Sequence, residues 1–512
     1  MLRTATLLCL GGLANAAPAQ PGTLDASFGT GGIVQINITS GYDTGTDLLP
    51  MAGGRLLVCG YGTPSSNSPE PFILRLLPDG TLDPDHGIVI LPHGSNGRAE
   101  GMVFAADSSV YLCGYADTLG HDRFTLWHVL PDGTPDPAFG MNGRVSVPLT
   151  GIYEIRALDI ALQPDGKLVL AGNKYFSTWD SFLARFNADG TLDSTFGFNG
   201  MLTMNNSDNA HDEFFTVGVL DDGSIVAGGY GKSGGLEYPL IVKLTPAGVP
   251  DSTFDGDGIL TPTLSFSETR VTCLVAVGQD VVAGGARYTG ISTTSDYFLI
   301  RFDDTGVLDP SFGTLGEEVT DVDADDYIRD LTILADGRMA VAGYTGDFTN
   351  GVGPIDFLTA VHTTDGAPYT TFGVTGYAIA ATSTGVDEGY AVKEQVDGKL
   401  VVSGSTYASS FNSMVTILRY ENDVNTMVTL STHEAGLMAW PNPANDHLRL
   451  NTAITGAARV EIMDATGGVV RNMHTPNANG LVIPVADLQP GRYLLRCADD
   501  SAERVVPFHI TR

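Results

Sequence analysis

Two short stretches of this sequence combine residue types that could carry out hydrolytic chemistry. Residues 231–235 read Gly-Lys-Ser-Gly-Gly, which fits the G-x-S-x-G pattern of serine hydrolases. That pattern needs a strand that runs into a helix and exposes the serine. Here it lies in a polar loop between two apolar runs, so we interpret the match as chance. His211 is followed by Asp212 and Glu213 but lacks the second spaced histidine of a metalloprotease. No catalytic residue is therefore predicted.

A third stretch is acidic and could bind a metal ion. Asp321, Asp323 and Asp325 alternate as in the first half of a calcium-binding loop. An EF-hand requires Gly at the sixth position and Glu at the twelfth, where this chain has Asp326 and Thr332. The stretch is either a calcium site or a solvated acidic loop. Calcium is the only cofactor that the sequence suggests.

Aromatic side chains recur in loops that are rich in Ser, Thr, Gly and Asn. Such a mixture combines rigid contact area with adaptable hydrogen bonding, as ligand-binding loops require. The alternative is that each ring covers the edge of its own structural unit. The candidate ligand-binding residues are Tyr175, Trp179, Tyr230, Tyr238, Tyr288, Tyr344, Phe348 and Tyr407.

Acidic residues also recur, once before each of seven apolar strands. They are Asp43, Glu100, Glu154, Asp212, Glu268, Asp326 and Asp387. A ring of carboxylates could collect cations. Hydrogen bonds from nearby turn amides to these carboxylates would explain the pattern equally well.

The elements that must position these residues are repeats. Seven copies of a unit contain Leu-Asp-x-x-Phe-Gly followed by apolar-apolar-small-Gly, with His86 in the Phe place of one copy. Successive copies of the second glycine are 54 to 61 residues apart. A period of this length indicates one supersecondary unit used repeatedly. The second glycines are Gly60, Gly114, Gly172, Gly228, Gly284, Gly343 and Gly404.

One copy predicts four strands and no helix. Its apolar segments are residues 144–148, 155–162, 167–172 and 181–186, and the middle pair is joined through Asp-Gly, a strong hairpin signal. Seven such units predict a seven-bladed β-propeller, in which we expect the first strand to be innermost. The repeated Phe would anchor blade against blade, and the glycines would mark close backbone approach.

The two ends of the repeat array support a closed ring. The array starts with part of a unit at 23–29 and ends with a fourth strand at 414–420, so pairing of the ends would complete the last blade. An open solenoid is the alternative. Antiparallel order places the repeated turns on one face and the variable loops, including the aromatic ones, on the other. Function is expected on the variable face.

The repeated blocks resemble the delta-60 repeat family of secreted bacterial proteins. Pro-Asp-Gly-Lys-(apolar)-Ala-Gly and Leu-Asp-x-x-Phe-Gly carry the resemblance over residues 22–420. Departures occur at His86, at Asp255 and in 361–369. The resemblance implies a repeat array and no defined chemistry.

The last part of the chain differs in composition and pattern. Residues 433–512 hold seven Arg and no Lys against eight acidic residues, and six short strands alternate with Gly-rich turns. This pattern predicts a small antiparallel β-sandwich. The segment resembles the C-terminal sorting domain of the type IX secretion system of Bacteroidota, through Pro441, Asn442, Pro443, Gly491 and Tyr493. The resemblance implies export across the outer membrane, whereas a generic carbohydrate-binding or adhesion sandwich is the alternative.

Charge and the N-terminus indicate an extracellular protein. Residues 1–19 have the Arg, apolar stretch and small residues of a secretory signal peptide. The formal net charge of -32 argues strongly against nucleic acid as a partner, because its phosphates need a basic surface. No later apolar stretch is long enough to cross a bilayer. We expect a secreted or outer cell-surface protein that passes through the periplasm.

The sequence therefore predicts an all-β protein with four parts. These are a signal peptide (1–19), a seven-bladed propeller of four-stranded antiparallel blades (20–424), a linker (425–437) and a C-terminal β-sandwich (438–512). The predicted function is non-enzymatic binding or adhesion, with the type IX secretion machinery and an unidentified glycan or protein as partners. The alternative is a secreted hydrolase or lyase that uses carboxylates at the propeller axis and a metal ion. A purely structural role in a surface layer is a third interpretation.

Overall fold

The fold was described from a computed structural model. It describes residues 20–422, except 65–67, 118–119, 148–153, 205–210, 265–267, 289–293, 348–353 and 410–411, and residues 437–510, except 441–446, 453–457, 465–468, 476–480, 489–490 and 499–502. The predicted signal peptide lies outside the described residues, as does the predicted linker up to residue 436. No helix among the described residues is long and apolar enough to cross a membrane.

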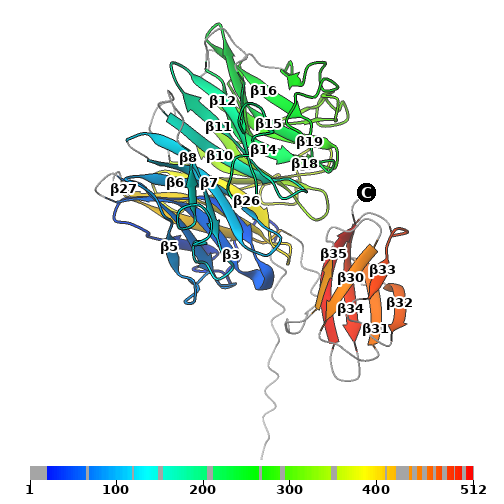
Figure 1. Cartoon of the computed structure of the whole chain (residues 1–512). Helices are drawn as coiled ribbons and strands as arrows, with labels where there is room; N and C mark the ends of the chain where they lie inside the picture. The colour runs from blue at the N-terminus through cyan, green and yellow to red at the C-terminus, as the bar shows by residue number, and fades with distance from the viewer. Residues whose placement is uncertain are drawn as a thin grey trace, which may run out of the picture.

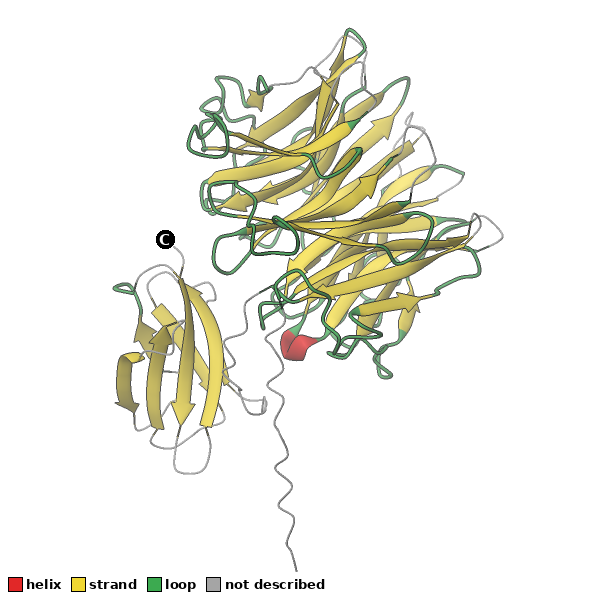
Figure 2. Ribbon diagram, turned by 180° about the vertical axis from the view of Figure 1, so that it is seen from behind, coloured by secondary structure: helices red, strands yellow, loops and turns green. Residues whose placement is uncertain are grey.

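Seven four-stranded antiparallel sheets form the first part of the chain (Figures 1 and 2). Within each sheet we name the strands A to D in the order of their pairing. Blade 1 is β2 (Tyr42–Pro50), β3 (Leu56–Thr63), β4 (Glu70–Leu76) and β5 (Ile88–Ile90). Blade 2 is β6 (Gly97–Phe104), β7 (Val110–Asp117), β8 (Asp122–Val129) and β9 (Arg144–Ser146). Blade 3 is β10 (Glu154–Leu162), β11 (Leu168–Tyr175), β12 (Trp179–Phe186) and β13 (Met201–Met204).

The other four blades follow the same plan. Blade 4 is β14 (Glu213–Val219), β15 (Ile225–Ser233), β16 (Leu236–Leu244) and β17 (Ile259–Leu260). Blade 5 is β18 (Glu268–Val277), β19 (Asp280–Tyr288), β20 (Ser295–Phe302) and β21 (Glu317–Thr320). Blade 6 is β22 (Asp325–Ile333), β23 (Met339–Gly346), β24 (Ile355–His362) and β25 (Tyr377–Ala380). Blade 7 is β26 (Asp387–Glu394), β27 (Leu400–Ser409), β28 (Asn412–Tyr420) and the N-terminal β1 (Ile33–Ile36).

The A strands define the axis of a closed ring. Each A strand contacts the A strand of the next blade, and β26 of blade 7 contacts β2 of blade 1. Buried apolar side chains fill the space between blades, for example Leu126 of blade 2 and Ile155 of blade 3. The fold is therefore the seven-bladed propeller that the repeats predict.

The strand order within a repeat differs by one from our expectation. The first strand of the third repeat, β9, is not innermost but pairs with β8 as the outermost strand of blade 2, and the second strand, β10, lies at the axis. The Leu-Asp-x-x-Phe-Gly turn keeps the chain beside the preceding strand through bridges such as Val129 to Pro135. Each strand of the repeat is therefore displaced by one place in the blade. The direction of every strand is unchanged, so the variable loops still lie on the predicted face. The variable face carries the B–C loops and the D–A connections.

The two ends of the array complete blade 7. β1 pairs with β28 from Ile33 opposite Leu418 to Ile36 opposite Val415. The strands coloured blue and yellow meet in this way (Figure 1). Asp25 accepts hydrogen bonds from Arg419 Nε and Lys399 Nζ, each at 2.7 Å, which ties the N-terminal segment to the last blade. The prediction of a ring closed by its ends is confirmed.

The Leu-Asp-x-x-Phe-Gly block is explained by folding. In blade 3, Asp193 pairs with Arg185 at 2.8 Å and accepts the amide of Thr195 at 3.0 Å, and Arg185 lies 4.7 Å from the ring centroid of Phe196. A Cβ at Gly248 of the next blade would lie 2.2 Å from the Phe196 ring, so the repeated Phe does anchor neighbouring blades. Equivalent pairs are Arg75–Asp83, Lys243–Asp251, Arg301–Asp309 and Arg419–Asp25, and in blade 2 His128 Nδ1 lies 2.9 Å from Asp136 at the same place.

Every A strand carries a β-bulge at the same place. The extra residues are Thr46, Glu100, Leu158, Phe215, Thr272, Arg329 and Tyr390. The bulge pushes a carbonyl oxygen toward the B strand, where a Cβ on the facing glycine would lie only 1.8–2.0 Å from it. Only glycine fits there. The facing glycines are Gly60, Gly114, Gly172, Gly229, Gly285, Gly343 and Gly404, so in blades 4 and 5 the structural position is one residue beyond the predicted Gly228 and Gly284.

The C-terminal part is a two-sheet sandwich. One sheet is β29 (Leu437–Trp440), β30 (His447–Thr452) and β33 (Val482–Pro484). The other is β32 (Val469–Thr475), β31 (Ala458–Asp464), β34 (Gly491–Ala498) and β35 (Glu503–Ile510). Leu448, Ile483, Val460 and Leu495 are buried between the sheets, as the alternating sequence predicts.

Candidate ligand-binding site

Four arginines lie between aromatic rings at the B–C loop end of the propeller. Arg98 and Arg156 belong to the A strands of blades 2 and 3, and Arg270 and Arg329 to those of blades 5 and 6. We call these arginines and the rings that they contact the arginine–aromatic belt. Its rings are Tyr61, Tyr115, Trp179, Tyr230, Tyr288, Tyr327, Tyr344 and Tyr390.

Each guanidinium group contacts a ring of its own blade and a ring of a neighbouring blade. A cation within about 6 Å of an aromatic ring centroid is attracted by the electrons of the ring face. The Cζ atom of Arg98 lies 4.1 Å from the Tyr61 centroid and 5.9 Å from that of Tyr115, and Cζ of Arg156 lies 5.0 Å from Tyr115 and 5.4 Å from Trp179. Cζ of Arg270 lies 5.2 Å from Tyr230 and 5.5 Å from Tyr288. Cζ of Arg329 lies 5.2 Å from Tyr344 and 4.4 Å from Tyr390.

The four arginines differ in their carboxylate partners. Arg156 pairs with Asp122 at 2.7 Å and with Glu154 at 2.9 Å, and Arg270 pairs with Glu237 at 2.5 Å. The described residues offer no ion pair or hydrogen bond to Arg98 or Arg329, and the Nε atoms of both are buried without a partner. Two of the four guanidinium groups therefore keep their N–H groups available.

Glu100 is the bulge residue that lies among these arginines. Burial raises the pKa of its carboxyl group to about 7, although the positive charges of Arg98, Arg156 and Arg329 act to lower it. Arg329 stands on blade 6 and Glu100 on blade 2, so their mutual influence acts across the axis. A carboxyl group that titrates near neutral pH is a feature of functional sites and of buried ion networks alike.

A second polar layer follows along the A strands. Asp47, Asp159 and Asp330 each accept a backbone N–H of the next blade at 2.8–2.9 Å. Asp330 also accepts Lys393 Nζ at 2.6 Å. Burial raises the pKa of Asp47 to about 7 and that of Asp159 to about 6. These carboxyl groups fasten neighbouring blades at the axis.

The predicted aromatic residues fall into three groups. Trp179, Tyr230, Tyr288 and Tyr344 belong to the belt, and Tyr175 packs on Trp179 with centroids 5.2 Å apart. Tyr407 contacts Tyr42, and Tyr238 packs on Gly231. Phe348 lies outside the described residues.

Sequence reasoning missed the arginines. Arg98, Arg156 and Arg270 each stand two residues before a bulge residue, and Arg329 is a bulge residue itself. A signal was present, because these arginines interrupt apolar strands on alternate positions. Its meaning depends on the bulge, which shifts the register of facing residues and is not visible in a period-2 pattern.

The predicted ring of acids does not act as one group. Asp43, Asp326 and Asp387 accept turn amides of residues just before them, for example Ile38 N on Asp43 at 2.7 Å. Glu154 pairs with Arg156, whereas Glu100 faces the belt. Hydrogen bonding within turns accounts for at least three of the seven.

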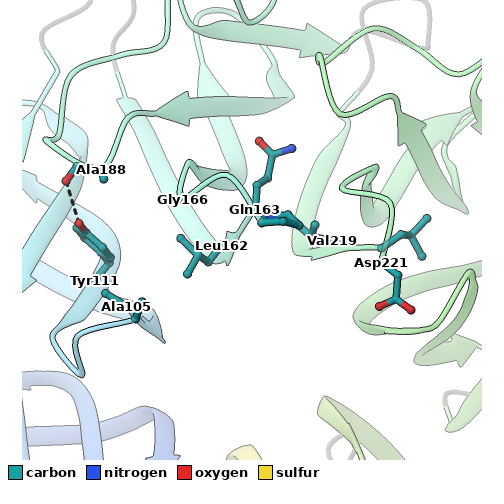
Figure 3. Close-up of a pocket in the computed structure, with 11 residues that line it drawn as sticks. Ala105, Tyr111, Leu162, Gln163, Gly166, Ala188, Val219 and Asp221 are labelled. Carbon is teal, nitrogen blue, oxygen red and sulfur yellow. Dashed lines mark hydrogen bonds between the residues drawn. The ribbon is translucent and has the colours of Figure 1, made fainter. Parts of the chain in front are cut away.

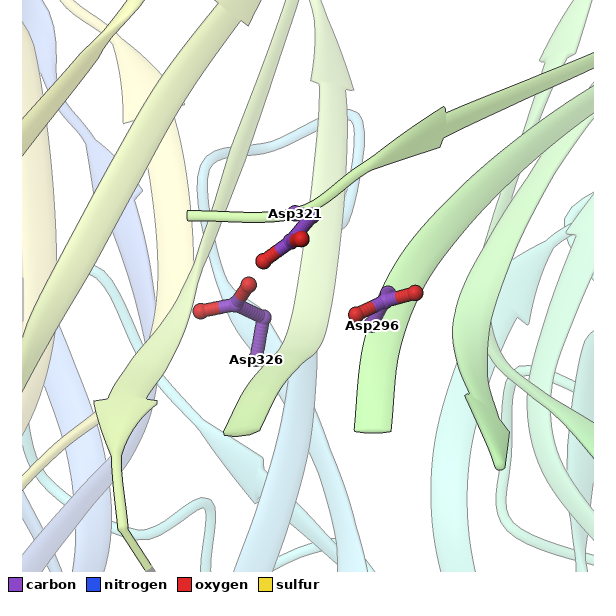
Figure 4. A group of neighbouring side chains, drawn as sticks. All are labelled: Asp296, Asp321 and Asp326. Carbon is purple, nitrogen blue, oxygen red and sulfur yellow. The ribbon is translucent and has the colours of Figure 1, made fainter. Parts of the chain in front are cut away.

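The predicted metal ligands are rearranged. Asp321 lies with Asp296 and Asp326, and their carboxylate oxygens are within 4.8 Å of one another (Figure 4). Asp323 is exposed, and Asp325 accepts the amide of Ser295 at 2.8 Å. Asp296 pairs with Arg287, and Asp326 accepts Thr345 Oγ1 at 2.6 Å, so both have partners without an ion. The calcium site stays a prediction.

A shallow hollow of about 560 Å³ lies on the opposite face, at the A–B turns of blades 2 to 4 (Figure 3). Ala105, Leu162, Pro164 and Leu220 line it, and Asp221 is its only charged residue. Tyr111 is tied to Ala188 O at 2.8 Å. Few polar groups converge there, so the hollow has less chemistry to recognise a ligand than the belt has.

The G-x-S-x-G match is a hairpin. β15 ends at Ser233, β16 begins at Leu236, and Gly234 and Gly235 have positive φ angles of 60° and 91°. Ser233 pairs with Leu236 across the turn. The serine is therefore not at a strand-to-helix elbow.

Two family models match parts of the chain. Residues 54–85, 163–196 and 220–254 match a domain of unknown function (DUF5122) beta-propeller, and residues 438–509 match a secretion system C-terminal sorting domain. The protein is thus a β-propeller with a type IX sorting domain, which directs export to the cell surface or the extracellular space. No curated protein is significantly similar to the chain.

Solved structures with a similar arrangement are distant. A protein of unknown function from Dyadobacter fermentans is 12% identical, with a TM-score of 0.43 over 76% of this chain and 98% of that one. The β-propeller domain of the Trilobed protease from Pyrococcus furiosus is 10% identical, with a TM-score of 0.41 over 77% and 98%. The polysaccharide lyase Uly1 is 11% identical, with a TM-score of 0.41 over 74% and 90%. At these scores they add nothing to the fold that the sheets define.

Of the residues that suggested the sorting domain, the structure describes those in β34. Pro441, Asn442 and Pro443 are outside the described residues. Gly491 begins β34, and Tyr493 is buried in the core of the sandwich. Tyr493 therefore stabilises the sandwich.

Proposed function

We propose that the protein is a non-catalytic binding protein, secreted or held at the cell surface, that recognises a glycan or a protein with the B–C loop end of its propeller. The observation that carries the proposal is the convergence of aromatic and arginine side chains from blades 1 to 7 on one end of the axis. Aromatic rings and arginines are the side chains most enriched at binding hot spots. The opposite face is occupied by repeated turns that folding alone explains.

The proposal is tested by binding of the exported protein to a glycan array and to extracellular proteins in a pull-down. Trp179→Ala and Tyr175→Ala should weaken the binding by about tenfold or more, as truncation of a hot-spot ring does. Phe198→Ala is the matched control, because Phe198 is 83% exposed in a turn of the other face. Binding that survives both Trp179→Ala and Tyr175→Ala would count against the proposal.

The second candidate function is a secreted hydrolase or lyase. It is favoured by Glu100, whose pKa of about 7 suits a general acid or base. Incubation of acidic and neutral polysaccharides with the protein would reveal new reducing ends or unsaturated products. Activity that Glu100→Gln abolishes supports this function, and absence of turnover on substrates that bind supports the binding protein.

A further inference from the structure

We infer that Arg98 and Arg329 together bind an oxyanion group, a carboxylate or a sulfate, of an acidic glycan. The inference deepens the proposed function and rests on it, because it names the class of ligand for the same end of the axis.

Stacking determines which part of each guanidinium group is free. Arg98 lies 4.1 Å from the Tyr61 centroid, and Arg329 lies 4.4 Å from that of Tyr390. A ring that covers the face of a guanidinium group holds it in place and leaves its N–H edge open. That edge has the fork geometry that matches a carboxylate or sulfate.

The N–H groups of these two arginines are not used within the described protein. The Nε atoms of both are buried, and neither side chain has a hydrogen-bond partner among the described residues. A buried donor without a partner is costly, whereas a charged acceptor that fills it is strongly favourable. Arg156 and Arg270, which contact similar rings, are already paired with Glu154 and Glu237. The belt therefore has two filled and two unfilled positions.

The two unfilled arginines belong to one region. Arg98 lies against Tyr61 of blade 1 and Arg329 against Tyr390 of blade 7, and the A strands of these two blades, β2 and β26, are neighbours in the ring. Both arginines also act to lower the pKa of Glu100. Glu100 has no hydrogen bond among the described residues, and the positive charges of Arg98 and Arg329 act on its carboxyl group. It is the carboxyl group with which a ligand anion competes. The nearby Glu388 accepts the hydroxyl group of Tyr390 at 2.8 Å.

The ligand must be recognised locally, since the whole molecule repels anions. The formal net charge is -32, and the field of so many carboxylates opposes the approach of an acidic polymer. Salt screens this repulsion over about 10 Å at 0.1 M, whereas a buried bidentate contact is screened less. Binding should therefore be retained, or strengthened, between low salt and about 0.15 M salt.

An acidic glycan fits this region better than an acidic peptide. The pair of Trp179 and Tyr175 is half-buried and continues the belt from Arg156, which offers a flat aromatic surface beside the charged one. Sugar rings pack on such surfaces. The protein is also exported, so an extracellular polysaccharide can reach this surface.

The test is isothermal titration of the full exported chain with polygalacturonate, alginate and chondroitin sulfate. Cellohexaose is the neutral counterpart, poly-glutamate the peptide counterpart, and sodium sulfate the free anion. At least one acidic glycan should bind, and Arg98→Gln and Arg329→Gln should each weaken it by about tenfold, the effect of losing a hydrogen bond to a charged group. Arg55→Gln is the matched control, because that side chain is half exposed at an A–B turn.

A variant that binds more tightly excludes a folding defect as the cause of the affinity changes. Glu100→Gln removes the competing charge and should tighten binding of the acidic glycan by a few-fold. Thermal unfolding of each variant accompanies the titrations.

Five results would overturn the inference. These are no binding of any acidic glycan, equal affinity for cellohexaose, equal affinity for poly-glutamate, binding of free sulfate as tight as that of the glycans, and unchanged affinity in both arginine variants. Binding of neutral glycans that depends on Trp179 but not on Arg98 would overturn the inference and leave the proposed function in place.

Discussion

At the scale of single residues, arginines stacked on aromatic rings have two different roles in this protein, one in the scaffold and one in the candidate site. Arg185 pairs with Asp193 and covers Phe196, and this arrangement recurs in most blades as part of the scaffold. Arg98 and Arg329 also lie against aromatic rings but have no described acid beside them. What separates scaffold from candidate site is thus the partner of the N–H groups, not the residue type.

The pKa of Glu100 makes ligand binding depend on pH. Burial raises this pKa to about 7, so Glu100 is negative at pH 8 and largely neutral at pH 6. The charged groups around it are Arg98, Arg156 and Arg329, with Tyr61 and Tyr115 uncharged in this range. Protonation removes the carboxylate that competes for the arginines, so affinity for an acidic ligand should rise by a few-fold from pH 8 to pH 6.

Titration calorimetry at pH 6, 7 and 8 measures this dependence. Glu100→Gln should show a smaller change in affinity over this range than the wild-type protein, since only more distant groups such as Asp47 still titrate near pH 7. If the wild-type protein and this variant show the same pH profile, Glu100 is not the titrating group.

At the scale of elements, the β-bulge is the device that shapes the axis. It inserts one additional residue into each A strand and requires a glycine on the facing B strand. The hairpins themselves could be predicted, since Asp-Gly between apolar runs identifies them. The bulges could not, because an inserted residue breaks the alternation without leaving a characteristic residue type.

Two glycines of blade 2 test this account. Gly114→Ala would place Cβ 2.0 Å from the carbonyl oxygen of Arg98, and we expect the free energy of unfolding to fall by about 3 kcal/mol or more. Gly101→Ala is the matched control, because its Cβ would meet nothing closer than 3.4 Å. Urea unfolding of both variants gives the comparison. Equal stability of the two would contradict the role of the bulge.

At the scale of the whole molecule, closure of the ring depends on a few contacts between residues far apart in the chain. Burial acts to raise the pKa of Asp25, but hydrogen bonds from Lys399 and Ser27 and the charge of Arg419 hold it well below its usual range. A carboxyl group with a lowered folded-state pKa contributes stability above the unfolded value of about 3.9 and loses it as pH falls. The closing contact is therefore intact at neutral pH and weakened in acid.

Replacement of Asp25 by Asn should open the ring locally. It leaves Arg419 buried without its charge partner, which costs about 3–5 kcal/mol, and it should raise amide hydrogen exchange in β1 and β28. Asp193→Asn removes the equivalent pair inside blade 3 and serves as control, since it should raise exchange in blade 3 and leave β1 protected. Unchanged protection of β1 in Asp25→Asn would show that the strand pairing alone closes the ring.

The sequence by itself determined the scaffold. The seven copies, the hairpins, the paired ends and the C-terminal sandwich follow from local patterns that recur with a fixed period, and each was confirmed. It also indicated the correct face for the variable loops, and four of the predicted aromatic residues lie in the belt. Local patterns suffice for these features because turn chemistry and alternation act over a few residues.

Only the tertiary structure decided which residues meet at the axis. Arg98 and Arg329 stand on blades 2 and 6, and nothing in their local sequences relates them. Two features bring them near Glu100. The strand that lines the axis is the second strand of the repeat instead of the first, and each of these strands carries a bulge. The physical reason is that contacts across a ring depend on its closure and on the register of every A strand, both of which are properties of the assembled blades.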